Sequence, residues 1–168
     1  MKIIFCQSIR AIDYYQQSLA IQQQIGDRDG EGSSLGNLGI AYSHLGKYQK
    51  AIDFYQQSLA IQQQIGDRND EAKSLNNLGN AYNSLGEYQQ AIDFHQQSLA
   101  IAQQIGDRNG EANSLISLGI TYQKLQQKSE AKAAYENARQ LYQEIELNKG
   151  VEICNKAIVY LEERDNYL

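Results

Sequence analysis

The chain has 168 residues, of which 42% are hydrophobic, and a formal net charge of −5. This length fits one domain, and the apolar content is enough to build a core. Charged residues of both signs are interspersed along the chain, which argues against nucleic acid as a partner. No apolar run approaches the roughly 20 residues that a membrane-spanning helix needs, so we expect no membrane partner.

The first residues carry an apolar run that is too short for a signal peptide, and we therefore expect a cytoplasmic protein. The two cysteines, Cys6 and Cys154, stand at opposite ends of the chain in unlike surroundings. This placement indicates free thiols rather than a disulfide framework or a repeated metal site. We predict no cofactor and no bound metal.

The dominant feature of the sequence is an internal repeat. Residues 27 to 66 match residues 67 to 106 at 28 of 40 positions, and the same frame continues with more drift over residues 107 to 146. Identity at this level indicates a duplicated structural unit, and drift is expected in a terminal repeat.

Each unit carries two apolar stripes with helical spacing. In the second unit, one stripe includes Leu75, Leu78 and Tyr82, and the next begins after Gly86. Gly106 suits the left-handed position after a helix, and the Asp of the Gly-Asp-Arg sequence that follows suits the N-cap of the next helix. The pattern predicts a helix, a short turn and a second helix, called here helix A and helix B.

Small residues recur where the two helices of a unit should cross. Glycine stands in helix A at positions 39, 79 and 119, and alanine stands in helix B at positions 51, 91 and 131. We expect these positions to permit close antiparallel packing, with Tyr55 and its equivalents filling the gaps.

Together these positions resemble the tetratricopeptide repeat pattern, which is matched by Leu35, Leu38, Gly39, Tyr42, Ala51, Tyr55 and Ser58. The 40-residue variant is similar to repeats of the LGN/Pins adaptors, of kinesin light chains and of bacterial, cyanobacterial-like arrays. The resemblance implies an all-α, right-handed α-solenoid of antiparallel helix pairs with about eight helices. It implies one domain over residues 1 to 168, with full repeats at 27–66, 67–106 and 107–146.

The same resemblance implies that the A helices line a concave groove that binds proteins. The residues expected to bind a peptide there are Asn37, Lys73, Asn76, Asn77, Asn80, Asn83, Asn113, Ser117 and Lys124. Asparagine both donates and accepts hydrogen bonds, so a ladder of amides can satisfy an extended peptide backbone. The alternative is a plain solvated helix face.

Catalysis is not predicted. The two histidines, His44 and His95, occupy different positions of the unit and lack a carboxylate or cysteine at ligand spacing, so we expect packing or surface roles for them. The repeated Gly-Asp-Arg sequences are predicted to serve as turns and caps, with Arg68 pairing with Glu71. A non-catalytic scaffold for protein–protein interaction is therefore the expected function.

The ends of the chain look like half-units. Residues 8 to 25 resemble a B helix without its A helix, and residues 149 to 164 resemble an A helix without its B helix. The stripe formed by Ile12, Tyr15 and Leu19 should then be partly uncovered. We expect a symmetric homodimer or head-to-tail association through these ends, or a cap formed by residues 1 to 7. A structural spacer or self-association module is accordingly the alternative function.

Overall fold

The computed structural model describes the backbone of residues 2 to 163 and the side chains of residues 8 to 163. All regular structure in this range is helical, which confirms the predicted all-α fold. The eight helices of the described range are α1 (Lys2–Ile25), α2 (Arg28–His44), α3 (Tyr48–Ile65), α4 (Arg68–Leu85), α5 (Tyr88–Ile105), α6 (Arg108–Lys124), α7 (Lys128–Glu144) and α8 (Asn148–Glu163). None of them is long and apolar enough to cross a membrane.

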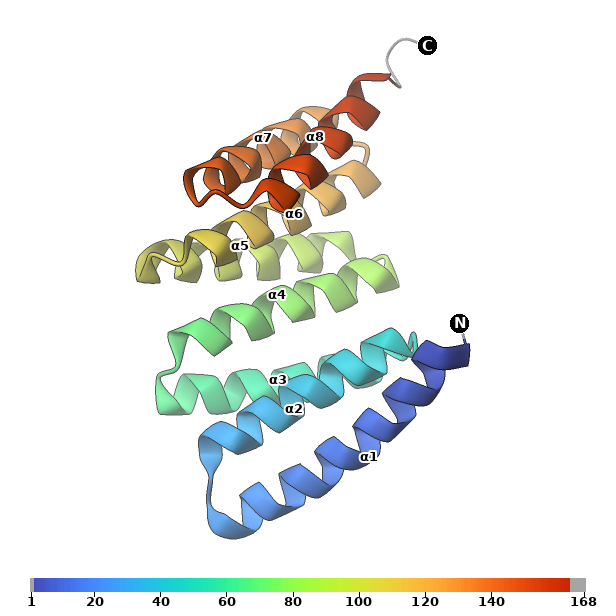
Figure 1. The fold of residues 1–168 in the computed structure, drawn as a ribbon, viewed down its shortest axis with the longest axis vertical. Helices are drawn as coiled ribbons and strands as arrows, with labels where there is room; N and C mark the ends of the chain where they lie inside the picture. Colours follow the sequence, from blue (N-terminus) through green and yellow to red (C-terminus); the bar gives the residue numbers. More distant parts are fainter. Residues whose placement is uncertain (1, 164–168) are drawn as a thin grey trace.

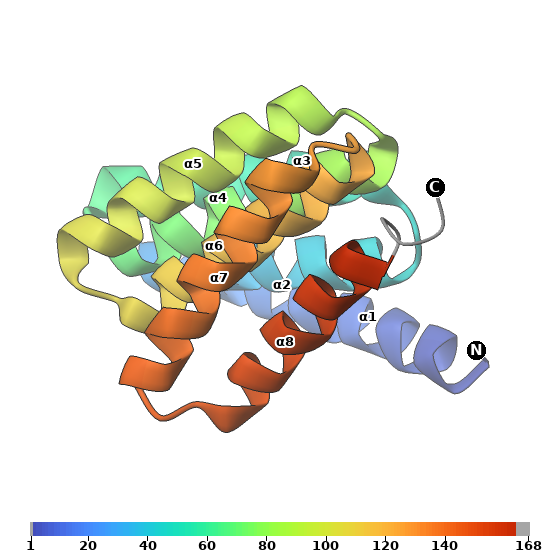
Figure 2. The same cartoon turned by 90° about the horizontal axis from the view of Figure 1, so that it is seen from above.

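The helices form a solenoid. Each helix packs on the next along the chain, and α2, α4 and α6 also contact one another in sequence. In Figure 1 the stack runs along the long axis of the molecule from α1 at one end to α8 at the other. Figure 2 looks down the stack and shows α5 and α7 crossing over α4 and α6. The A-type helices therefore share one layer of the stack, and α3, α5 and α7 form the other.

Glycine and aspartate set the boundaries between units, as the sequence predicts. Gly66 and Gly106 end α3 and α5 with φ of +77° and +73°, a region where a residue without a Cβ avoids strain. Asp67 then caps α4 by accepting a hydrogen bond of 3.0 Å from the backbone N–H of Asp70. A unit thus ends and the next begins within a two-residue link.

The close crossing of the two helices in each unit also follows the prediction. A Cβ placed on Gly39 would lie 2.4 Å from the ring of Tyr55, and one placed on Gly79 would lie 2.4 Å from the ring of His95. At Gly119 the corresponding distance to Tyr135 is 2.7 Å. An aromatic ring therefore lies directly against the backbone of each full A helix.

The apolar core continues across unit boundaries. One buried cluster joins Ala51, Ile52 and Tyr55 of α3 with Leu78 and Ala81 of α4. Because each B helix packs against the A helices before and after it, a unit shares its core with its neighbours. This arrangement is typical of repeat proteins, whose units cannot bury their apolar faces alone.

The two ends of the stack differ in character. Residues 2 to 7 continue α1 as helix, so the alternative in which they fold back as a cap is wrong. Helix α8 packs on α7 and buries Cys154, which is a free thiol, whereas the side chain of Cys6 lies outside the described residues.

Two glycines on α2 provide a matched test of the crossing. We expect Gly39→Ala to lower the free energy of unfolding by about 1 to 3 kcal/mol, because its methyl group overlaps the Tyr55 ring. Gly36→Ala meets only Ser58 Oγ, at 3.4 Å, and should raise stability by about 0.5 to 1 kcal/mol through helix propensity. Urea denaturation measures both variants, and similar effects of the two substitutions would contradict the proposed contact.

Candidate concave binding site

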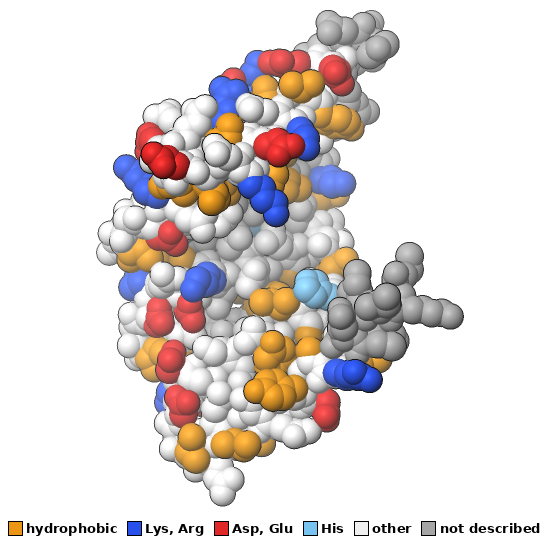
Figure 3. Space-filling model, viewed as in Figure 1, with side chains coloured by type: hydrophobic (Ala, Val, Ile, Leu, Met, Phe, Trp, Pro, Cys, Tyr) orange, Lys and Arg blue, Asp and Glu red, His pale blue; other side chains and the backbone are white. Residues whose placement is uncertain are grey.

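The concave side of the stack contains a polar cleft between α2 and α4. The face drawn in Figure 3 is hollowed between the two ends of the molecule. The cleft has a volume of about 210 Å³. Its lining comprises Gly32, Ser33, Gly36, Asn37 and Ile40 from α2, Ser58 and Gln62 from α3, and Asp70, Lys73, Ser74 and Asn77 from α4.

Three of the predicted peptide-binding residues meet in this cleft. Asn37 comes from α2, and Lys73 and Asn77 come from α4. The Lys73 ammonium lies 2.7 Å from the carboxylate of Asp70, and both side chains are solvent-accessible. The cleft therefore combines amide groups with a charge pair whose two charges offset each other, which favours an uncharged ligand.

Two other predicted residues have their amides engaged within the fold. Asn76 Oδ1 lies 2.9 Å from Nδ1 of His95, and Asn113 Oδ1 accepts a hydrogen bond of 2.7 Å from the hydroxyl of Tyr142. Each contact joins an A helix to the B helix of its own unit. These amides position the helices, a role that the sequence did not reveal.

The remaining predicted residues are spread along the concave side. Asn80 and Lys124 are exposed, and Asn83 is half-buried. Ser117 is only 7% exposed, so little of its side chain is accessible from the groove. It occupies the position of Asn37 and Asn77 one unit later, and its shorter side chain does not reach the surface.

Buried serines connect the floor of the cleft to its walls. Ser58 donates a hydrogen bond of 2.8 Å to the carbonyl of Gly32, and its oxygen lies 3.3 Å from the Ser74 hydroxyl. Ser98 repeats the arrangement one unit later, at 2.8 Å from the Ala72 carbonyl and 2.9 Å from Ser114. The serines thus link three consecutive helices, which fixes the width of the cleft.

His95 takes the place of the tyrosine that fills the crossing in the other two full units. It is fully buried, which agrees with the expected packing role. Tyr135 donates a hydrogen bond of 3.1 Å to Gln123, but the shorter imidazole leaves its Nε2 and the equivalent Asn83 Oδ1 without partners among the described residues. Burial lowers the pKa of His95 to about 4, because the charged imidazolium would lose its hydration.

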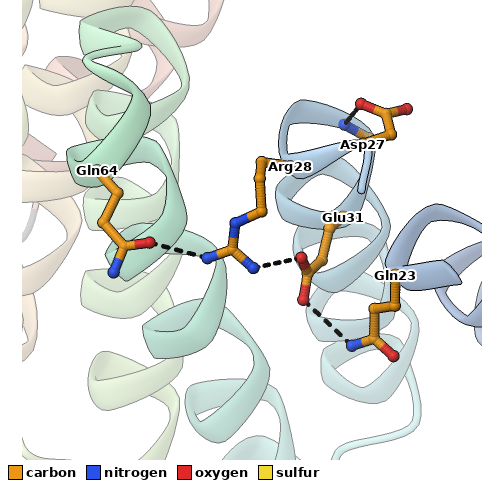
Figure 4. A network of polar contacts seen from close by, with 6 residues as sticks. Gln23, Asp27, Arg28, Glu31 and Gln64 are labelled. Carbon is orange, nitrogen blue, oxygen red and sulfur yellow. Dashed lines mark hydrogen bonds and ion pairs between the residues drawn. The ribbon is translucent and has the colours of Figure 1, made fainter. Parts of the chain in front are cut away.

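The Gly-Asp-Arg links form a polar network on the surface. Asp27 accepts a hydrogen bond of 3.0 Å from the N–H of Gly30, and Arg28 pairs with Glu31 (Figure 4). Arg28 also donates to Gln64 of α3 in the same unit at 2.8 Å, and Gln23 of the preceding helix α1 donates to Glu31 at 3.1 Å. The next link repeats this network, with the predicted pair of Arg68 and Glu71. The motif therefore caps helices and connects units, and no group of three or more potential metal ligands occurs among the described residues.

At the N-terminal end, the open face of α1 borders a second cavity. This cavity has a volume of about 650 Å³ and is lined by Ser8, Ala11, Tyr15, Asn37, Ile40, Ala41 and His44. Ile12, Tyr15 and Leu19 are half-buried, whereas Tyr14 and Ile25 are 68% and 69% exposed. The equivalents of Ala11 and Tyr15 one unit later are fully covered by α2. The open cavity thus marks where an A helix would pack.

Helix α8 does not have the surface that would fill this place. At three positions where α6, one repeat earlier, has leucine, glycine and tyrosine, α8 has Asn155, Val159 and Glu162. In each of the three full units, a Cβ added at this glycine would overlap the aromatic ring of the B helix. Packing of α8 onto α1 of another copy would place Val159 against Tyr15, which disfavours the head-to-tail association considered from the sequence.

Comparisons with known proteins agree with this architecture. A family model described as "Tetratricopeptide repeat" matches residues 7–64 and 70–144. A putative kinesin light chain from Podospora anserina, with nearly identical repeats, is 19% identical with a TM-score of 0.64 and covers 95% of this chain and 89% of that chain. BtubC from P. vanneervenii is 14% identical with a TM-score of 0.62, covering 98% and 92% of the two chains.

A larger structure gives a better superposition. A Rap protein in complex with Competence and Sporulation Factor is 16% identical with a TM-score of 0.84 over 94% of this chain. The match covers only 47% of the Rap chain. A comparison with curated protein sequences found no match. At these identities the structural likeness establishes the fold alone.

The buried imidazole predicts a pH dependence of stability. Because the folded-state pKa of His95 is about 4 and the usual value is 6.5, the unfolded chain takes up a proton first on acidification, and stability falls as the pH drops through this window. Relative to His95→Tyr, the wild type should lose about 2 kcal/mol more between about pH 7.5 and pH 5. Urea denaturation at both pH values measures this difference. Parallel pH profiles of the two proteins would contradict a buried neutral histidine.

Proposed function

Because this chain belongs to the tetratricopeptide repeat family, we propose that it is a non-catalytic scaffold whose concave cleft binds an extended segment of another protein. The observation that carries the proposal is the cleft between α2 and α4, where Asn37 and Asn77 meet. Neither side chain forms a hydrogen bond with another described residue, so both amides are free to pair with a peptide backbone.

The setting of the two asparagines supports a binding role. They stand at equivalent positions of successive units, on opposite sides of one cleft, above a floor that buried serines hold in place. An extended chain lying along the cleft would present N–H and C=O groups at regular intervals, which suits amides that donate and accept. The Rap structure with its bound factor is a precedent for ligand binding on this fold, without identifying a ligand for this chain.

Alanine substitutions in the cleft, compared with equivalent substitutions on the outer layer of α3 and α5, test the proposal. Peptides selected against the wild type from a displayed library of random peptides serve as probes. We expect Asn37→Ala combined with Asn77→Ala to weaken binding at least about tenfold, because each change removes hydrogen bonds worth about 1 kcal/mol. Fluorescence anisotropy measures the affinity, and circular dichroism checks the fold.

The matched control moves the same chemical change to the outer layer. Gln56→Ala combined with Gln96→Ala removes two exposed amides from α3 and α5 and should leave affinity unchanged. Failure to select any peptide, or equal loss with the outer pair, would refute binding in the concave cleft.

We propose self-association through α1 as a second function, because an apolar surface remains open there. Tyr14, Ile21 and Ile25 are more than half exposed along this helix, next to the cavity that an A helix would otherwise fill. The occupant we favour is α1 of a second copy in a symmetric pair, since a two-fold contact closes and α8 presents valine where a glycine is needed.

Sedimentation equilibrium tests this second function. We expect a dimer at micromolar concentration, and we expect Tyr14→Lys combined with Ile21→Lys to give a monomer of unchanged helicity, because two charges would be buried in the contact. Lys substitutions at Gln57 and Gln97, exposed on α3 and α5, provide the control. A wild-type monomer at high micromolar concentration would rule out the dimer.

A further inference from the structure

Gln62 is an unusual residue in the floor of the cleft between α2 and α4. Its side chain is 1% exposed and contributes to the cleft lining. Its carbonyl oxygen Oε1 has no hydrogen-bond partner among the described residues. A buried amide oxygen normally accepts a hydrogen bond, because leaving it unpaired forfeits the hydration it has in the unfolded chain.

The equivalent positions in the other units do not share this feature. Gln22 accepts a hydrogen bond of 2.6 Å from the Ser34 hydroxyl. Ala102 has no polar side-chain atom, and Tyr142 donates its hydroxyl proton to Asn113. Among these four equivalent residues of the described range, Gln62 alone has a buried side-chain oxygen with no hydrogen-bond partner.

The serine next to Gln62 has a different partner from its counterpart next to Gln22. Ser74 is the counterpart of Ser34, but its hydroxyl lies beside Ser58 at 3.3 Å. Ser58 already donates its one hydroxyl proton to the carbonyl of Gly32. The hydroxyl of Ser74 lies beside Ser58 and forms no hydrogen bond with Gln62, in contrast to the bond between Ser34 and Gln22.

Glycine at position 32 makes room for the glutamine. A Cβ on Gly32 would lie 2.5 Å from Nε2 of Gln62, and alanine occupies the position of Gly32 in the next two units. The Gln62 amide thus lies against an open stretch of α2 backbone in the first full unit. The cleft between α2 and α4 therefore differs in its local geometry from the equivalent place between α4 and α6.

We propose that Gln62 is a specificity-determining residue whose Oε1, which is covered in the free protein, becomes accessible through a small shift of the cleft floor and accepts a hydrogen bond from an uncharged N–H or O–H group of the bound segment. This inference rests on the proposed peptide-binding function of the cleft. The ligand donor is uncharged because the nearby charges of Lys73 and Asp70 are already paired with each other. The bound segment would place a backbone amide, or a hydroxyl or amide side chain, over the floor of the cleft.

A substitution that keeps the volume and removes the acceptor tests the inference. We expect Gln62→Met to weaken binding of the library-selected peptides by about tenfold, the effect of one lost hydrogen bond. Stability of the free protein should not fall, because the oxygen that is removed had no partner. Unchanged affinity would overturn the inference.

The same change at Gln22 is the matched control. Its oxygen is already bonded to Ser34, so Gln22→Met should lower the stability of the free protein and leave peptide affinity unchanged. The opposite responses of the two variants separate an acceptor used by the ligand from one used by the fold. Equal losses of affinity in both variants would also overturn the proposal.

Two further experiments identify the donor, one with modified peptides and one with the wild-type protein alone. N-methylation at single backbone positions of the peptide removes one N–H at a time, and alanine replacement removes side-chain donors. One of these changes should cost about tenfold in affinity for the wild type and nothing for Gln62→Met. The ¹³Cδ shift of Gln62 should also move on peptide addition, and a shift that stays fixed would overturn the proposal.

These outcomes distinguish the two proposals. If peptides bind and depend on Asn37 and Asn77 but not on Gln62, the cleft function stands and this inference fails. If no peptide is selected, or if binding ignores the asparagines, the cleft function fails and this inference fails with it.

Discussion

The contact between an aromatic ring and a glycine backbone determines how closely the two helices of each unit approach. Tyr55 lies against Gly39, His95 against Gly79 and Tyr135 against Gly119. Because a methyl group at any of these glycines would overlap the ring, the helix spacing depends on the absence of one Cβ. The buried alanines of the B helices complete the contact from the other side. Close crossing then allows each B helix to pack on two A helices at once, and the repeated geometry produces the curved stack.

The cleft follows from the same packing. With the A helices held in one layer, Asn37 of α2 faces Asn77 of α4 across a floor of buried polar groups. The serines of that floor join neighbouring helices, and the Gln62 oxygen beside them has no partner among the described residues. The ends of the stack break this regularity. Helix α1 exposes an apolar face where a helix could pack. Helix α8 also exposes apolar side chains, Ile153, Val159 and Tyr160, but it carries Asn155 and Glu162 where α6 has leucine and tyrosine.

Sequence periodicity predicts the fold closely because the repeat displays the same packing positions three times. Gly106 ending a helix, Asp107 capping the next and Gly39 beneath Tyr55 each stand where a local steric or hydrogen-bonding reason favours a few residue types. The site is harder to predict, since side chains at equivalent positions differ in their partners. Asn76 faces the concave side by periodicity, yet it pairs with His95, which replaces tyrosine only in that unit. Ser117 is too short to reach the surface, and periodicity does not reveal that Gln62 lacks the serine partner that the equivalent Gln22 has.

Binding of an extended segment between α2 and α4 through free amides can be tested by a crystal structure of the chain with a library-selected peptide. We expect an extended peptide between α2 and α4, with backbone hydrogen bonds to Asn37 and Asn77 and an N–H or O–H group within hydrogen-bonding distance of Gln62 Oε1. A peptide bound on the outer layer of α3 and α5, or against the open face of α1, would contradict binding in this cleft.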